Sequence, residues 1–116
     1  MAAKECLFCK IVTGDIPADV VYRDDDVLAF RDINPRAPIH VLVIPKEHLD
    51  SLASVADEHR DLMGHIMLVA REIAKDEGLG TSGYRTVINV GVDGGQTVQH
   101  LHLHLLGGRA LSWPPG

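Results

Sequence analysis

The chain has 116 residues, of which 46% are hydrophobic and 23% charged, and its formal net charge is −5. This length supports one domain with a single core, so we expect residues 1–116 to form one domain, and the composition excludes a disordered chain. The acidic balance, without a cluster of lysines or arginines, speaks against partners such as nucleic acid or an anionic membrane surface. A small ligand is the better expectation.

The first residues, MAAKECLFCKIV, place Lys4 and Glu5 where a secretory signal would need an apolar run. No stretch reaches the roughly 18 apolar residues of a membrane span. We therefore expect a cytoplasmic protein. In a reducing compartment, Cys6 and Cys9 are expected to be free thiols or metal ligands rather than a disulfide.

Three strands are predicted in the first part of the chain. Apolar runs at 20–22 and 27–30 flank three aspartates at 24–26, which indicates two strands joined by a solvated polar turn. The breaker segment NPRAP is followed by IHVLVIP at 39–45, a β-branched run of strand length.

One long helix is predicted over residues 57–77, where apolar side chains recur at helical spacing until Gly78 and Gly80 stop the pattern. His59 and His65 lie off the main apolar stripe, and we expect both to be exposed.

Two further strands are predicted from YRTVINV at 84–90 and VQHLHLHLL at 98–106, joined by the glycine-bearing turn GVDGGQT. The sum is an α+β fold, with an antiparallel sheet that carries a helix on one face.

The last of these strands carries histidine at every second position: His100, His102 and His104. Side chains alternate along a strand, so the three histidines should share one face while the leucines between them meet the helix. A zinc site made by these three alone is disfavoured, because the outer Cα atoms would be about 13 Å apart and Zn–N bonds measure about 2.1 Å. We expect the three histidines to have separate roles; the plain alternative is a polar, outward-facing surface whose residues happen to be histidines.

The segment just before this row offers a place for an anion. Gly94 and Gly95 let backbone amides approach closely, and Gln96 and Thr97 add neutral hydrogen bonds, although two glycines in a turn are commonly only a turn. Imidazole suits phosphoryl chemistry because its ordinary pKa near 6.5 leaves one nitrogen free to attack at neutral pH.

The run HLHLHLL, preceded by GGQTVQ and followed by GGRALSWPPG, resembles the histidine triad superfamily in its Hint (histidine-triad nucleotide-binding) branch, and FCKIVTGDIPADVVYRDDDVLAFRDINPRAPIHVLVIPKEHL extends the resemblance over nearly the whole chain. The resemblance implies a five-stranded antiparallel sheet with one long helix and a short N-terminal helix. It implies a homodimer with a ten-stranded sheet, a purine nucleotide on each subunit, and a C-terminal tail of residues 107–116 near the partner's active site. The implied activity is hydrolysis of purine nucleoside phosphoramidates, with no cofactor for catalysis.

Carried over by position, His102 is the nucleophile that forms a covalent nucleotidyl-histidine. A backbone carbonyl holding its Nδ1–H would leave Nε2 as the attacking atom. His104 and His40 would lie beside the phosphate, suited to charge stabilisation or proton transfer, and Thr97 competes with them for protonating the leaving amine. The implied nucleotide contacts are Phe8, Ile11 and Phe30 at the base, Asp32 and Ile33 at the ribose, Asn89 at the ribose or phosphate, and Gly95, Gln96, Thr97, His102 and His104 at the phosphate.

In metal-binding branches of the superfamily, a similar cysteine pair joins two histidines. Here the set would be Cys6, Cys9, His48 and His100, a normal donor set for a structural zinc ion; two buried free thiols are the alternative. If zinc binds, His100 is structural, and a chelator should loosen the N-terminus while the rate on folded protein stays nearly intact.

Other functions stay open from the sequence. Hydrolysis of dinucleoside polyphosphates is the rival within the superfamily, and the WPPG tail argues against it. A nucleotide-binding interaction protein with weak catalysis is a second alternative, and a zinc-dependent hydrolase, disfavoured by the geometry of the row, is a third. The resemblance implies that Trp113 in this tail contacts the leaving group across the dimer; a frayed tail is the plain alternative.

Overall fold

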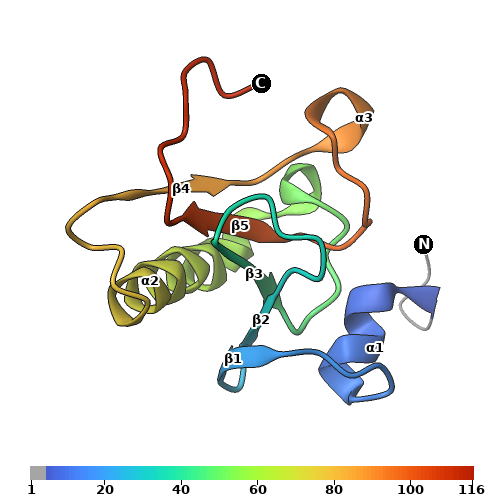
Figure 1. The fold of residues 1–116 in the computed structure, drawn as a ribbon. Coiled ribbons are helices and arrows are strands. Elements are labelled where there is room, and N and C mark those ends of the chain that lie inside the picture. The colour runs from blue at the N-terminus through green and yellow to red at the C-terminus, as the bar shows by residue number, and fades with distance from the viewer. Residues whose placement is uncertain (1–4) are drawn as a thin grey trace.

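The structure, a computed structural model, describes residues 5–116; Lys4 and the rest of 1–4 lie outside the described residues. These residues form a five-stranded antiparallel sheet with one long helix and a short N-terminal helix, which confirms the expected α+β fold (Figure 1). In chain order the elements are α1 (Leu7–Thr13), β1 (Val20–Arg23), β2 (Val27–Arg31), β3 (Ile39–Pro45), the 3-10 turns η2 (Leu52–Ser54) and η3 (Asp57–His59), α2 (Arg60–Asp76), β4 (Tyr84–Val87), α3 (Gly91–Gly94) and β5 (Leu103–Gly107).

The strands lie in the order β1-β2-β3-β5-β4, so the last strand of the chain is inserted between β3 and β4. The first three strands, whose positions were predicted from the sequence, form a meander. Asp24 closes its first turn by accepting the backbone N–H groups of Asp26 and Val27, each at 2.8 Å. The short polar side chain thus replaces ladder hydrogen bonds at the tip of the hairpin.

The two helices cover opposite faces of the sheet (Figure 1). Alternate residues of β2 and β3 pack in two separate clusters because strand side chains alternate. The cluster under α2 includes Val41, Val43 and the leucines of the histidine row, Leu101, Leu103 and Leu105. The cluster under α1 consists of Cys6, Phe8, Ile11, Leu28, Phe30, Leu42 and Ile44. The prediction that the leucines meet the long helix is therefore confirmed.

The last two strands are shorter than predicted. β4 ends at Val87, the glycine-bearing turn is the short helix α3, and β5 starts only at Leu103, so His100 and His102 precede the strand. The backbone before β5 makes its hydrogen bonds outside the ladder: the Leu101 N–H donates to the Leu49 carbonyl at 2.7 Å. The alternation of faces nevertheless persists through this segment, since Leu101 lies in the α2 cluster while the ring of His100 contacts Phe8 on α1.

The expectation that His59 and His65 are exposed is wrong. Both are half-buried, because each has an acidic partner that the helical pattern does not reveal. The Nε2 of His59 lies 3.3 Å from a Glu47 carboxylate oxygen, and His65 pairs with Asp24 of the β1–β2 turn.

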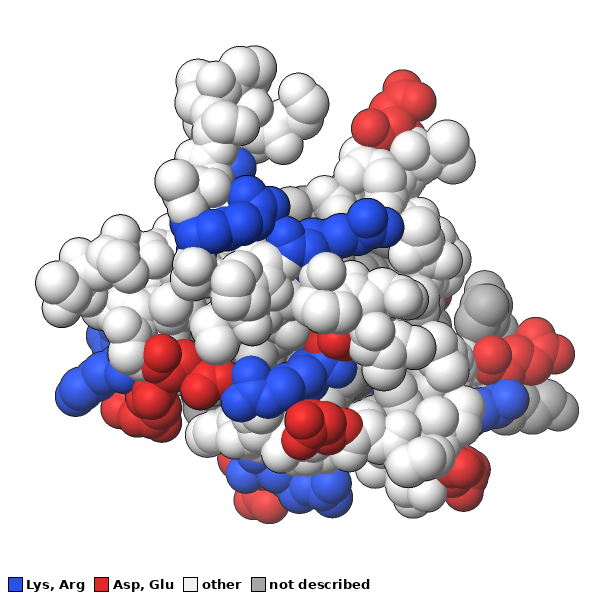
Figure 2. Space-filling model, in the orientation of Figure 1, with Lys and Arg blue, Asp and Glu red and all other residues white. Residues whose placement is uncertain are grey.

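Two arginines hold the C-terminal segment. Arg85 of β4 donates to the carbonyl of Ser112 at 2.8 Å, and Arg109 donates to the carbonyl of Arg36 at 2.8 and 3.1 Å. Trp113, just beyond, is 82% exposed. Figure 2 shows basic side chains gathered across the upper middle of this face, with acidic and basic side chains mixed below. Within residues 5–116, no helix is both long and apolar enough to span a membrane.

Candidate nucleotide and metal sites

A pocket of about 290 Å³ opens on the α1 side of the sheet, next to the histidine row. Eight of the predicted nucleotide-contacting residues line it: Phe8, Ile11, Phe30, Asp32, Ile33, Thr97, His102 and His104. The pocket wall also includes residues that the sequence analysis missed: Leu7, Ile16, Pro17, Ala18, Arg31, Asn34, Leu42 and Val98. For Leu42 a signal existed, since it lies two residues after His40 on a strand and therefore shares its face.

His102 is buried, with 6% of its surface exposed, and one of its ring nitrogens is committed. Its Nδ1 lies 2.7 Å from the backbone carbonyl oxygen of His100. A carbonyl only accepts hydrogen bonds, so Nδ1 carries the proton and Nε2 keeps a free lone pair. Burial lowers the pKa of His102, which favours this neutral form, and the ring of Phe8 packs edge-on against it at a centroid distance of 5.2 Å.

His40 and His104 form a hydrogen-bonded pair whose direction follows from the backbone. The N–H of Arg36 donates to Nδ1 of His40 at 3.0 Å, so in neutral His40 the proton is on Nε2. That Nε2 lies 2.9 Å from Nδ1 of His104 and donates to it, which leaves the Nε2–H of His104 as a donor. Burial, together with the neighbouring His102 and His40, lowers the pKa of His104 to about 4, so the ring is neutral at physiological pH.

Asp32 lies at the edge of this pair, with a carboxylate oxygen 3.5 Å from Nε2 of His40. It also accepts the backbone N–H of Asn34 at 2.8 Å, an interaction typical of an aspartate that begins a turn. The next residue, Ile33, is 91% exposed at the pocket rim. Both side chains are therefore placed where a ligand in the pocket would meet them.

Three predicted nucleotide-contacting residues, Asn89, Gly95 and Gln96, do not line the pocket. The amide of Gln96 is instead engaged within the protein: its nitrogen donates to the carbonyls of Asp50 at 2.7 Å and Val98 at 3.0 Å, and its oxygen accepts the N–H of Gly91 at 3.1 Å. Gln96 thus holds the loop that carries Thr97 into the pocket wall.

The predicted metal-ligating residues are brought together from three parts of the chain. One ligand atom from each of Cys6, Cys9, His48 and His100 lies within 4.8 Å of the others. The Nδ1 of His100 is 3.3 Å from Sγ of Cys6 and 3.6 Å from Sγ of Cys9, and the Nδ1 of His48 is 3.3 Å from Sγ of Cys9. A tetrahedral zinc ion would separate sulfur and nitrogen ligands by about 3.6 Å, given its usual bond lengths.

The surroundings of this cluster also suit a metal ion. The Nε2 of His48 lies 2.8 Å from the carboxylate of Asp50, and the Nε2 of His100 lies 2.8 Å from the carbonyl of Pro45. Each ring therefore donates its proton to an oxygen on the far side and turns an unprotonated Nδ1 to the cysteines, as metal-ligating histidines do. Burial, with Cys6 alongside, raises the pKa of Cys9 to about 11, and a bound cation would displace that proton.

A second cluster, of Asp32, His40 and His104, also brings three ligand atoms within 4.8 Å. Here the two ring nitrogens are only 2.9 Å apart, a hydrogen-bond distance shorter than the about 3.3 Å expected between two nitrogen ligands of a tetrahedral zinc ion. The geometry fits a proton-sharing pair better than a metal site.

Comparison with known proteins agrees with this arrangement. The family model described as scavenger mRNA decapping enzyme C-term binding matches residues 5–112. An uncharacterized HIT-like protein of Synechococcus elongatus is 57% identical over 114 residues, covering 98% of this chain and 99% of the relative. The chain belongs to the histidine triad (HIT) family.

Two further relatives of this HIT protein bear on its two sites. A 14 kDa zinc-binding protein of Zea mays is 53% identical over 112 residues, covering 95% of this chain and 87% of the relative. The crystal structure of a HIT family hydrolase from Legionella pneumophila is 54% identical, with a TM-score of 0.95 over 96% of this chain and 99% of that one. The chain thus has the fold of a HIT family hydrolase.

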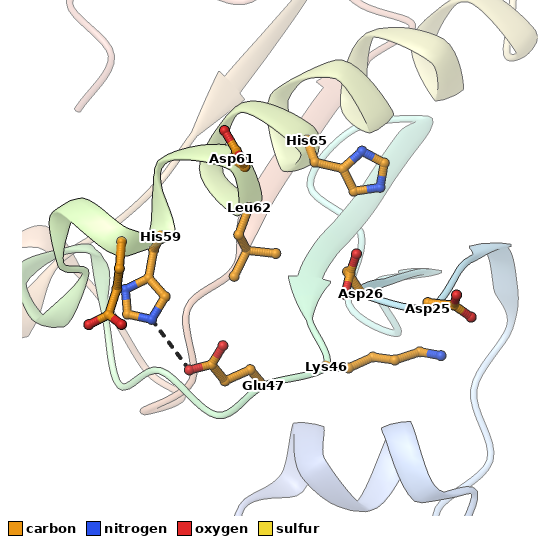
Figure 3. A pocket seen from close by; sticks show the side chains of 9 residues that line it. Asp25, Asp26, Lys46, Glu47, His59, Asp61, Leu62 and His65 are labelled. Atoms are coloured by element: carbon orange, nitrogen blue, oxygen red, sulfur yellow. Dashed lines mark hydrogen bonds and ion pairs between the residues drawn. The ribbon is translucent and has the colours of Figure 1, made fainter.

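The HIT protein has another, larger hollow of about 620 Å³ between the start of α2 and the turns that flank β2 and β3 (Figure 3). Its lining consists mostly of acidic residues, Asp25, Asp26, Glu47, Glu58 and Asp61, together with Lys46, two histidines and one leucine. It has neither a histidine of the row nor an apolar wall for a base, so it is not the candidate nucleotide site.

Proposed function

We propose that this HIT protein hydrolyses purine nucleoside phosphoramidates through a covalent nucleotidyl-His102 intermediate, as a member of the Hint branch. The observation that carries the proposal is the hydrogen bond from Nδ1 of His102 to the His100 carbonyl, which leaves Nε2 as a nucleophile in a pocket wall. The relatives support a hydrolase, and the bond cleaved is our assignment.

In the proposed first step, Nε2 of His102 attacks the α-phosphorus and the phosphorus–nitrogen bond breaks, so that the amine leaves with a proton. His104, as a neutral ring, can donate a hydrogen bond from its Nε2–H to a phosphate oxygen or to the leaving amine, and the Thr97 hydroxyl is the other donor in the wall. In the second step, water attacks phosphorus and the Nε2–phosphorus bond breaks; the proton that the water loses replaces the one carried off by the amine, the nucleotide is released and His102 regains its lone pair.

The rest of the pocket suits a purine nucleotide. Phe8, Ile11 and Phe30 supply an apolar wall for the base, while the Asp32 carboxylate can accept from both ribose hydroxyls. For Asn89, Gly95 and Gln96, contact with the nucleotide stays a prediction.

We also propose that the protein is a cytoplasmic homodimer, with β4, an edge strand in this chain, joining the partner's sheet. The tail held by Arg85 and Arg109 would then bring the exposed Trp113 towards the partner's active site. A zinc ion at Cys6, Cys9, His48 and His100 would supply structural cross-linking and no step of the reaction.

The deciding experiment is mass spectrometry of enzyme quenched in denaturant at alkaline pH, milliseconds after mixing with a fluorogenic adenosine phosphoramidate. We expect a nucleotidyl adduct on the peptide that contains His102. Turnover without an adduct, and with equal speed in the His102→Asn variant, would reject the mechanism. A diadenosine polyphosphate run in parallel tests the rival substrate class, and no turnover of either substrate would favour the interaction-protein alternative.

A further inference from the structure

We propose that metal binding at the Cys6, Cys9, His48 and His100 cluster tightens nucleotide binding in the pocket, because helix α1 belongs to both sites. The inference concerns regulation of the proposed nucleotide site and rests on a purine nucleotide being its ligand.

The metal cluster is built into the first turn of α1. Cys6 is the N-cap residue, and its Sγ accepts the backbone N–H of Cys9 at 3.4 Å. The other two ligands come from far along the chain, His48 after β3 and His100 before β5. A bound cation would therefore tie the start of α1 to two segments of the sheet side.

The residues between the two cysteines belong to the nucleotide pocket. Leu7 and Phe8, the two central letters of CLFC, both line it, and Ile11 follows one turn later. Phe8 is buried and packs edge-on against the rings of Phe30 and His102, at centroid distances of 5.4 and 5.2 Å. The position of these side chains is consequently set by the same helical turn that presents the thiols.

Helix α1 is also short enough for a bound metal to affect its stability. It has seven residues, and a helix this short is not stable without tertiary contacts. Without a cation, apolar and ring packing and weak thiol–imidazole contacts hold its first turn to the segments of His48 and His100 within residues 5–116. A metal that orders α1, and a nucleotide that packs on it, therefore stabilise the same conformation, and each should raise the affinity of the other.

The nucleophile should respond less than the pocket wall. His100 is fully buried, and its Nε2 donates to the Pro45 carbonyl, a contact outside α1, so the segment whose carbonyl holds His102 has an anchor besides α1. The inference therefore separates two kinetic effects: metal removal should raise KM and the nucleotide Kd, and change kcat little.

The test measures both affinities with the full chain. Isothermal titration of AMP into zinc-loaded and zinc-stripped protein should give a Kd that is lower with zinc by about 5-fold or more, the usual range of such coupling being about 5–150-fold. Titration of Zn²⁺ with and without saturating AMP should give the same factor, as linkage demands. A change below about twofold in both titrations would overturn the inference, as would a failure of AMP to bind in either state.

Variants of α1 test whether this helix couples the metal cluster to the nucleotide pocket. Phe8→Leu should bind Zn²⁺ like the wild type yet lose most of the zinc effect on AMP, and Leu7→Ala, at a partly exposed position, does the same if Phe8→Leu fails to fold. Thr13→Ala, on the exposed end of α1, is the matched control and should keep the full coupling. A full zinc effect in both Phe8→Leu and Leu7→Ala would overturn the role of α1.

Neither titration requires turnover. If AMP and Zn²⁺ affinities are coupled while phosphoramidates are not hydrolysed, the inference stands and the proposed function fails. If phosphoramidates are hydrolysed and the affinities are independent, the inference fails alone.

Discussion

His100 and His102 are two residues apart in one row, and their rings use opposite nitrogens. In His100 a carbonyl takes the Nε2 proton and Nδ1 faces the cysteines, whereas in His102 a carbonyl takes the Nδ1 proton and Nε2 is left for the pocket. The residue type is the same, and the position of one carbonyl oxygen decides which nitrogen has the lone pair. The sequence motif therefore identifies which residues are histidine, and the backbone carbonyl next to each ring decides which of its nitrogens can bind a metal or attack a substrate.

The largest expected effect tests the catalytic half of this comparison. His102→Asn removes the free Nε2 lone pair, so turnover of an adenosine phosphoramidate should fall at least about a thousandfold while AMP binding survives. Steady-state kinetics and calorimetry on the same preparation check both parts. If turnover fell less than tenfold, His102 and His100 would not differ in the way proposed.

Leu103, which lies between His102 and His104, tests the opposite face of the row, the one that packs under α2. Leu103 is 1% exposed in the core under α2, so Leu103→Ala should lower the free energy of unfolding by about 2–5 kcal/mol. Activity per folded molecule should stay near that of the wild type, because the substitution is on the side away from the pocket. Urea denaturation measures the loss, and a loss below about 1 kcal/mol would contradict the assignment of faces.

Substitution of His40 tests whether the hydrogen bond from its Nε2–H to Nδ1 of His104 matters for catalysis. His40→Ala removes the donor to Nδ1 of His104, and we expect kcat to fall about ten- to a hundredfold through misplacement of that ring. His40→Gln can supply an amide N–H at a similar reach and should recover part of the loss. Equal activity of the two variants would show that His40 only fills space.

The smallest expected effect concerns Asp24, the partner of His65, a histidine outside the row. Burial opposes ionisation of Asp24, but hydrogen bonds from Tyr22, His65 and the amides of Asp26 and Val27 outweigh it and lower the pKa of the carboxyl. A lowered carboxyl pKa stabilises the fold above the unfolded-state value near 3.9, and this contribution is lost as pH falls through the folded-state pKa.

Asp24→Asn should therefore cost about 1–2 kcal/mol at pH 7, and the difference from the wild type should shrink below about pH 4. Denaturant titrations at pH 7 and pH 3 compare the two proteins. A difference that grows at low pH would show that the charge of Asp24 is not what stabilises the turn.

Local pattern predicted much of the fold, because strands and helices follow from spacing. The three strands to Pro45, the long helix and the alternation of leucine and histidine were all visible in this way. The late start of β5 was not, since it depends on the carbonyl of Leu49, a residue far from it in sequence. The acidic partners of His59 and His65 were hidden for the same reason.

For the candidate site, too, some residues could be predicted from the sequence and others could not. The family pattern named the four residues of the metal cluster and eight that line the pocket. It did not indicate that the side-chain amide of Gln96 forms hydrogen bonds with three backbone groups, because a glutamine beside two glycines is equally suited to bind a phosphate. The apolar wall around Ile16 and Pro17 was also missed, as no period or motif marks a connecting segment.

The strand order has a consequence for how the protein is made. During synthesis β1, β2 and β3 can pair as soon as they leave the ribosome, whereas β4 has no neighbour in its own chain until β5 emerges and enters between it and β3. His104 is part of that late strand, and the two rings before it depend on the same segment. The nascent chain can thus have β1, β2 and β3 paired and yet lack the assembled histidine row until β5 has been translated.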